Sequence, residues 1–166
     1  DNIDDLLREH SVKAAKSKWP RIAYGCSFQK DAKACEVKYL ERFGETARSY
    51  WEYETAQYFM QQWTLTAPKQ ANSWRTLGWL QYETGRFASA DATVKHALQL
   101  DPKSAYGHQI LARIALALGN NKDAESLSRK AIELDNDYAW PWESLARALA
   151  AQDKYAEAQQ AIDAAR

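Results

Sequence analysis

The second half of the chain repeats itself every 34 residues, and this period constrains the fold more than any other feature. Segment 71–104 aligns with segment 105–138 without a gap, so that Leu77 matches Leu111 and Gly85 matches Gly119. The sequence from residue 139 onward continues in the same register until the third copy stops at Arg166. A period of this length predicts a stack of equivalent helical units, in which neighbouring units bury each other's apolar faces.

Each 34-residue copy of the repeat carries the sequence pattern of two helices. Apolar residues recur at helical spacing, as in Trp74, Leu77 and Leu80. The chain has only 6 Gly and 4 Pro, and Gly85 and Gly119 stand where the first helix of a unit must end and the chain reverse. The expected fold class is therefore all-α.

The positions that repeat resemble those of the tetratricopeptide repeat family, whose 34-residue unit is a pair of antiparallel helices. That family favours Trp, Leu, Gly or Ala, Ala, Ala and Pro at places 4, 7, 8, 20, 27 and 32. In segment 71–104 these places hold Trp74, Leu77, Gly78, Ala90, Ala97 and Pro102. The resemblance implies a right-handed α-α superhelix built of helix-turn-helix repeats.

Upstream of residue 71 the pattern weakens. Segment 37–70 keeps Gly44 and Pro68 in register but has Trp63 where a small residue belongs and no Gly, Asn or Asp at its turn. It is either a distorted repeat, which we favour, or one long helix from about Glu36 to Trp63. We expect one continuous domain that consists of a non-repeat cap (1–36), a degenerate helix pair (37–70), two full repeats (71–104, 105–138) and a truncated repeat (139–166). Within the cap, we expect a helix near Ile3–Lys18, followed by an irregular stretch that Pro20 and Gly25 break.

In the family, places 2, 5, 9, 12 and 13 of the first helix line the concave surface of the superhelix. Trp142 falls at the packing place 4, whereas Trp140 falls at place 2 and is expected to face the groove. Trp, Tyr and Arg are also the residues most enriched in binding hot spots. The resulting candidates for partner binding are Arg75, Trp79, Tyr82, Tyr106, Gln109, Arg113, Trp140, Glu143 and Arg147. The alternative is that some of the aromatic residues pack against the upstream aromatic helix instead.

One well-known subfamily binds acidic chaperone C-termini through a carboxylate clamp. Arg75 fits one of its places, but Trp79, Ile110, Trp140 and Ser144 do not fit the others. This chain is not expected to form that clamp.

Charge and motifs exclude several other classes of protein. Lys plus Arg and Asp plus Glu both number 22, so no overall field favours nucleic acid or an anionic membrane. The basic run 8–21 is expected to be a solvated helix face. No window is apolar enough to span a membrane, and no catalytic motif, metal-ligand pattern or cofactor site is found. We therefore expect a protein that is not an enzyme.

The two cysteines, Cys26 and Cys35, lie nine residues apart. They are either two unrelated thiols or a local disulfide, and their even number and proximity favour the disulfide slightly. A disulfide would favour an extracytoplasmic compartment, periplasmic or secreted, whereas free thiols would suit the cytoplasm.

Together these features predict a protein–protein interaction module that binds a partner protein or peptide in its concave groove, as an adaptor, assembly factor or co-chaperone. The alternative is a regulatory or sensory domain of a larger protein, such as a membrane-anchored regulator. Because the last helix leaves Ala158, Ala161, Ile162 and Ala165 without a following helix, we also expect further repeats or a homodimer through that end.

Overall fold

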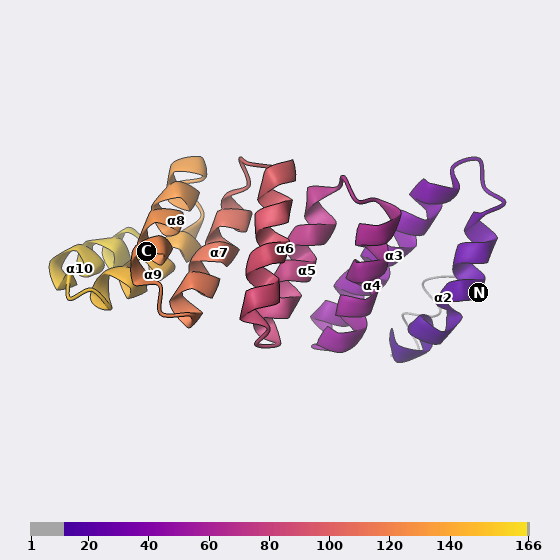
Figure 1. The fold of residues 1–166 in the computed structure, drawn as a ribbon, viewed down its shortest axis with the longest axis horizontal. Coiled ribbons are helices and arrows are strands. Elements are labelled where there is room, and N and C mark those ends of the chain that lie inside the picture. The colour runs from indigo at the N-terminus through magenta and orange to yellow at the C-terminus, as the bar shows by residue number, and fades with distance from the viewer. Residues whose placement is uncertain (1–11, 166) are drawn as a thin grey trace. The chain divides into compact units, whose positions relative to one another are not determined.

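In the computed structural model, which describes residues 12–165, the chain is helical (Figure 1). The described part contains no strand, and the all-α prediction is confirmed there. None of its helices is both long and apolar enough to cross a membrane. The helices are α2 (Val12–Cys26), α3 (Ala32–Ser49), α4 (Tyr53–Thr66), α5 (Ala71–Glu83), α6 (Phe87–Leu100), α7 (Ala105–Ala117), α8 (Asn121–Leu134), α9 (Ala139–Ala150) and α10 (Tyr155–Ala164).

The helices belong to two compact units. The first, Asp1–Thr84, contains α2 to α5, and the second, Gly85–Arg166, contains α6 to α10. The division falls inside the sequence repeat 71–104, between its two helices. The sequence period therefore marks where helices begin, and it does not mark where the compact units divide.

The 34-residue period sets the first residues of three helices. α5, α7 and α9 begin at Ala71, Ala105 and Ala139, which are the first residues of the three predicted repeats. The start of α7 is fixed by Ser104, whose hydroxyl accepts a hydrogen bond from the Gly107 amide at 3.1 Å. Equivalent residues thus occupy equivalent helical positions, as the alignment predicted.

A second recurrence lies in the turns between paired helices. Left-handed backbone occurs at Trp51 (φ 62°), Gly85 (φ 75°), Gly119 (φ 76°) and Asp153 (φ 62°), again at intervals of 34 residues. After three of these turns the next amide reaches back five residues to a helix carbonyl, from Glu52 to Ala47, from Asn120 to Ala115 and from Lys154 to Leu149, at 2.8–3.0 Å. Segment 37–70 therefore forms two helices, α3 and α4, and not one long helix.

The tryptophans at place 4 make a third recurring contact. The Trp74 indole N–H donates to the Pro68 carbonyl at 2.8 Å, and the Trp142 indole N–H donates to the Asn136 carbonyl at 3.4 Å. In both cases the acceptor lies six residues earlier, at place 32 of the preceding segment. Trp142 also packs against the cluster around Leu145, as its packing role predicted.

The core of the first unit is aromatic. Phe43 of α3 and Phe59 of α4 are fully buried, with ring centroids 5.2 Å apart, and Trp19 of α2 meets Phe59 edge-on at 6.4 Å. α3 and α4 approach closely because Gly44 has no side chain, and a Cβ there would overlap the Met60 methyl group. The packing of α2, α3 and α4 therefore depends on the ring of Phe59.

Residues 12–18 are helical as expected, but the irregular stretch expected after them is wrong. The stretch around Pro20 and Gly25 is not irregular, because α2 runs through both and ends at Cys26; residues 3–11 of the predicted helix lie outside the described part. Ala15 and Trp19 are buried, so apolar packing on one side of α2 stabilises the helix. Pro20 is exposed, so water can bind the carbonyl that its missing N–H leaves unpaired.

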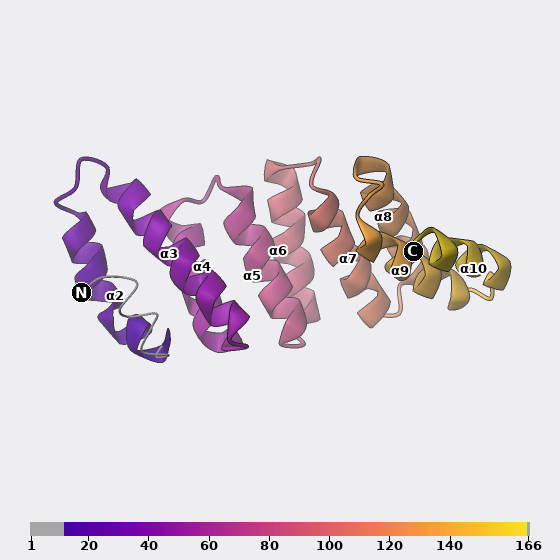
Figure 2. The ribbon, with the colours of Figure 1, turned by 180° about the vertical axis from the view of Figure 1, so that it is seen from behind.

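A buried amide and an ion cluster link helices of the second unit, besides their apolar packing. The buried Gln109 amide of α7 donates to the Trp140 carbonyl at 3.1 Å and to the Ser144 hydroxyl at 3.0 Å, both on α9. On α8, Glu125 binds Lys154 at 2.8 Å and Arg129 at 3.0 Å. Figure 2 shows these helices from behind.

The hydrogen bond from Lys154, together with those from Arg129 and Gln152, lowers the pKa of Glu125 to about 2 although partial burial opposes this shift. Since the pKa is below its usual value of 4.5, the carboxylate stabilises the fold above about pH 4.5 and loses this contribution as the pH falls towards 2. We expect Glu125→Gln to lower the free energy of unfolding by about 1 kcal/mol at pH 7, after allowance for solvent screening.

In urea denaturation at a series of pH values, the difference between wild type and Glu125→Gln should shrink between pH 4.5 and 2. The control is Glu133→Gln, because this carboxylate pairs with Lys130 but its side chain is 69% exposed, and its effect should be a few tenths of a kcal/mol. A Glu125→Gln effect that does not change with pH would contradict the assignment.

Candidate functional site: the exposed face of α9

α9 exposes one stripe of side chains and buries most of the others. Trp140, Glu143 and Arg147 follow each other at intervals of three and four residues, which places them on one helical face. All three are exposed, Trp140 to 57%. The residues buried on the other faces are Pro141, Ser144, Leu145, Ala146, Ala148 and Leu149.

The charged residues of this stripe are available to bind a partner molecule. Within the part of the chain that the structure describes, neither the Glu143 carboxylate nor the Arg147 guanidinium forms an ion pair. Trp140 uses its backbone carbonyl to bind Gln109, while its indole remains on the surface. An exposed aromatic ring beside unpaired charges of both signs is a surface that a polypeptide segment can contact.

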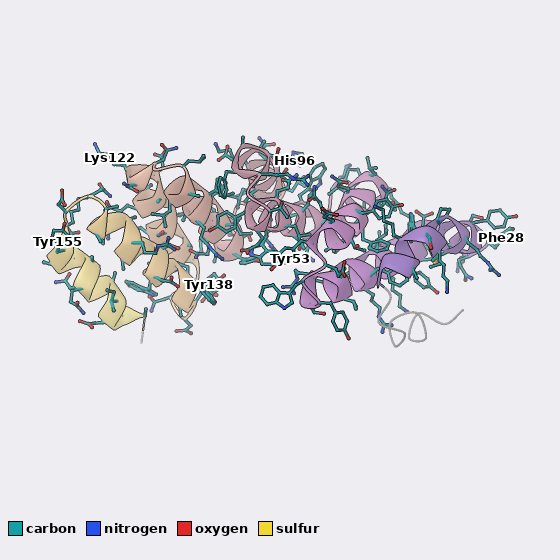
Figure 3. The ribbon with its side chains drawn as sticks, turned by 90° about the horizontal axis from the view of Figure 1, so that it is seen from below. Phe28, Tyr53, His96, Lys122, Tyr138 and Tyr155 are labelled. Carbon is teal, nitrogen blue, oxygen red and sulfur yellow. A yellow bond between two sulfur atoms is a disulfide. The ribbon has the colours of Figure 1, made fainter. Side chains whose placement is uncertain are left out.

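α7 contributes less exposed surface to the same unit. Tyr106 is 37% exposed, and its ring meets that of Tyr138 at 6.4 Å, while Arg113 is half-buried. Tyr138 precedes α9 and is labelled in Figure 3. Tyr106, Tyr138 and Trp140 thus bring three aromatic side chains to the N-terminal ends of α7 and α9.

Gln109 does not belong to an accessible site, contrary to the prediction. It is only 2% exposed, and its amide N–H groups are used in the hydrogen bonds to α9. The resemblance placed it on the concave surface of the groove, but α9 covers it. Gln109 is therefore a structural link between α7 and α9.

The three candidates of α5 lie in the first unit, and each is half-buried. The Arg75 guanidinium donates to the Asn72 side-chain oxygen at 2.7 Å. Trp79 meets Tyr53 of α4 edge-on at 5.8 Å, and the Arg48 guanidinium lies 5.4 Å from its ring centroid. Trp79 therefore packs on the upstream helices, which is the alternative considered for these aromatic residues, and Tyr82 stays a candidate.

Sequence reasoning missed an aromatic group at the turn between α3 and α4. Trp51 is 78% exposed and Tyr50 is 50% exposed. Trp51 occupies the turn position that holds Gly85, Gly119 and Asp153 in the other turns, and Tyr50 precedes it. The departure from the repeat pattern at Trp51 was visible in the sequence. That departure was the only signal that could have identified this surface.

Cys26 and Cys35 form the expected disulfide, with their Cα atoms 5.5 Å apart. The bond joins the last residue of α2 to the first turn of α3, beside a cavity of about 280 Å³ that Lys18, Arg21 and Tyr39 help to line. In the residues that the structure describes, no three His, Cys, Asp or Glu side chains come together as metal ligands would.

Comparison with known proteins agrees with this architecture. A family model described as tetratricopeptide repeat matches residues 71–104 and 105–138, and a second with the same description matches residues 127–160. Comparison with curated proteins found no match.

Solved structures with similar folds include several repeat proteins. A crystal structure of MamA is 15% identical with a TM-score of 0.80, over 99% of this chain and 92% of that one. A thermophilic repeat protein of Thermus thermophilus is 17% identical with a TM-score of 0.72, over 78% and 72% of the two chains. An O-GlcNAc transferase mutant of Thermobaculum terrenum is 24% identical with a TM-score of 0.69, over 73% of this chain and 23% of that one. The repeated helix pairs, the recurring turns and the matched segments agree: the chain belongs to the tetratricopeptide repeat family.

Proposed function

We propose that the second unit is a non-catalytic interaction module that binds a segment of a partner protein across α7 and α9. The observation that carries this proposal is the exposed stripe of Trp140, Glu143 and Arg147 on a helix whose other side chains are mostly buried. Burying the Trp140 ring supplies apolar contact area, and an aromatic side chain loses little rotamer entropy on binding.

The two charges of the stripe define what the partner segment should carry. The Arg147 guanidinium can bind a carboxylate of the partner through two parallel hydrogen bonds. The Glu143 carboxylate, one helical turn before Arg147, can accept a hydrogen bond from a donor of the partner. The partner is therefore an extended segment with an apolar residue for Trp140 and an acidic residue for Arg147. Such a module serves as an adaptor, assembly factor or co-chaperone. The Cys26–Cys35 disulfide supports an oxidising compartment for this role.

The test is affinity capture with the wild-type chain and with Trp140→Ala/Arg147→Ala, followed by quantification of the bound proteins by mass spectrometry. Since hot-spot residues each contribute about 2 kcal/mol, the double variant should retain less than a tenth of a specific partner. Both side chains are exposed, so circular dichroism of the variant should match that of wild type.

Lys122→Ala provides the control, because Lys122 is an exposed residue at the start of α8 and lies outside the stripe (Figure 3). This variant should capture as much of the partner as wild type does. Equal capture by wild type and the double variant would refute binding at the stripe and leave the fold unaffected.

A further inference from the structure

The turn between α3 and α4 presents an exposed tryptophan in an unfavourable backbone conformation. Trp51 adopts φ 62° and is 78% exposed. A left-handed residue with a Cβ costs about 1–2 kcal/mol, and the equivalent turns at residues 85 and 119 avoid this cost with glycine. Neither burial of Trp51 nor local backbone preference explains a tryptophan here.

The Trp51 ring is the outermost member of an aromatic group within the first unit. Its centroid lies 5.9 Å from that of Tyr53, and the Tyr53 ring stands perpendicular to that of Trp79 at 5.8 Å. Tyr53 opens α4 and is labelled in Figure 3. We call Trp51, Tyr53 and Trp79 the aromatic shelf; it combines side chains from the α3–α4 turn, α4 and α5.

The shelf already holds one cation. The Arg48 guanidinium lies 5.4 Å from the Trp79 ring centroid and forms an ion pair with Glu45 at 2.6 Å. Aromatic faces attract cations because the ring quadrupole is negative on the face, and tryptophan does so most strongly. The face of Trp79 thus binds an internal guanidinium, while Trp51 carries the exposed ring.

The charges around the shelf are mainly acidic. Glu52 and Glu54 flank Tyr53 in the sequence, Glu83 acts on the Tyr53 hydroxyl, and Glu45 pairs with Arg48. Burial raises the pKa of the Tyr53 hydroxyl, the Glu83 carboxylate raises it further, and Arg48 lowers it. The electrostatic potential here favours positively charged ligands.

We propose that the aromatic shelf is a second interaction surface, which binds a basic, extended polypeptide segment by placing a Lys or Arg side chain on the Trp51 ring. The ring supplies the cation–π contact, and the surrounding carboxylates supply long-range attraction. A neutral sugar would gain no net charge attraction from the carboxylates, and the rings of the shelf, inclined to each other by 55° and 89°, form no single flat platform for it. The surface lies in the first unit and is independent of the stripe on α9.

The substitution Trp51→Gly is expected to remove the ring and leave the fold intact, because Trp51 is exposed and its backbone is left-handed. Because glycine adopts the left-handed conformation freely, the variant should unfold at an equal or higher urea concentration than wild type. Asp153→Gly is the matched control at the equivalent turn of the second unit, and it should leave binding at the shelf unchanged.

The binding test uses hexa-arginine as the probe and follows the Trp51 indole N–H by NMR. Wild type should show a shift of this resonance that saturates, and Trp51→Gly should bind at least fivefold more weakly by calorimetry. Hexa-citrulline, which keeps the shape of the side chain without its charge, should not bind. Trp140→Ala should bind hexa-arginine as wild type does, which separates this surface from the proposed function.

Three outcomes would overturn the proposal. Equal affinity of Trp51→Gly and wild type would mean that hexa-arginine binds the acidic surface without the ring. Equal binding of hexa-citrulline would remove the role of charge. A shift of the Trp51 resonance with maltoheptaose but not with hexa-arginine would assign the shelf to carbohydrate.

Discussion

Replacing Phe59 by alanine is expected to lower the free energy of unfolding of the first unit by about 3–5 kcal/mol. The ring is fully buried, and it contacts Trp19, Phe43 and Tyr58 at centroid distances of 6.4, 5.2 and 5.3 Å. Its removal leaves a cavity at the point where α2, α3 and α4 meet, and rigid neighbouring rings cannot close that cavity.

Urea denaturation followed by tryptophan fluorescence measures this effect, because Trp19 and Trp63 are buried in the same core. The matched control is Phe28→Ala, since Phe28 is 72% exposed in the loop before α3 (Figure 3). Its effect should stay within about 0.5 kcal/mol. Similar losses for the two phenylalanine variants would contradict the assigned core.

The second large effect is expected from the disulfide. Cys26→Ala/Cys35→Ala should lower the free energy of unfolding of the first unit by about 2.5 kcal/mol, because the cross-link closes a loop with a sequence separation of 9 and restricts the unfolded chain. The loss should be largest for α2, whose C-terminal residue the bond ties to α3. Hydrogen exchange of the α2 amides, compared with those of α9, locates the effect.

Dithiothreitol provides the control for this variant. It should destabilise wild type by a similar amount and leave the double alanine variant unchanged. A thiol assay of the native protein should detect no reactive cysteine, since both sulfur atoms are in the disulfide. If reduction did not change the stability of wild type, the cross-link would have no structural role.

The repeated part of the fold could be predicted because its information is local. The glycines at 85 and 119 permit the left-handed backbone of the turns, and small residues allow two helices to approach closely. Both effects involve only residues of a single helix pair. The first residues of α5, α7 and α9 follow from the same alignment. The exposure of Trp140 and the partial burial of Trp142 follow from their different places on one helix.

The candidate site was predicted less well, because a position on a helical face does not say what covers that face. Gln109 occupies a groove place, yet α9 buries it, whereas Glu143 at the same place of the next repeat is exposed. Trp79 is engaged by Tyr53 and Arg48 from upstream helices that depart from the repeat. The aromatic shelf was missed for the same reason.

The sequence by itself determined the helix pairs, their period and the turns between them, since each depends on contacts between residues close together in the chain. Only the tertiary structure decided that α2 continues through Pro20, that Gln109 is buried and that Trp51 joins Tyr53 and Trp79. These outcomes depend on residues of other helices, whose packing outweighs the small free-energy differences that local sequence preferences supply.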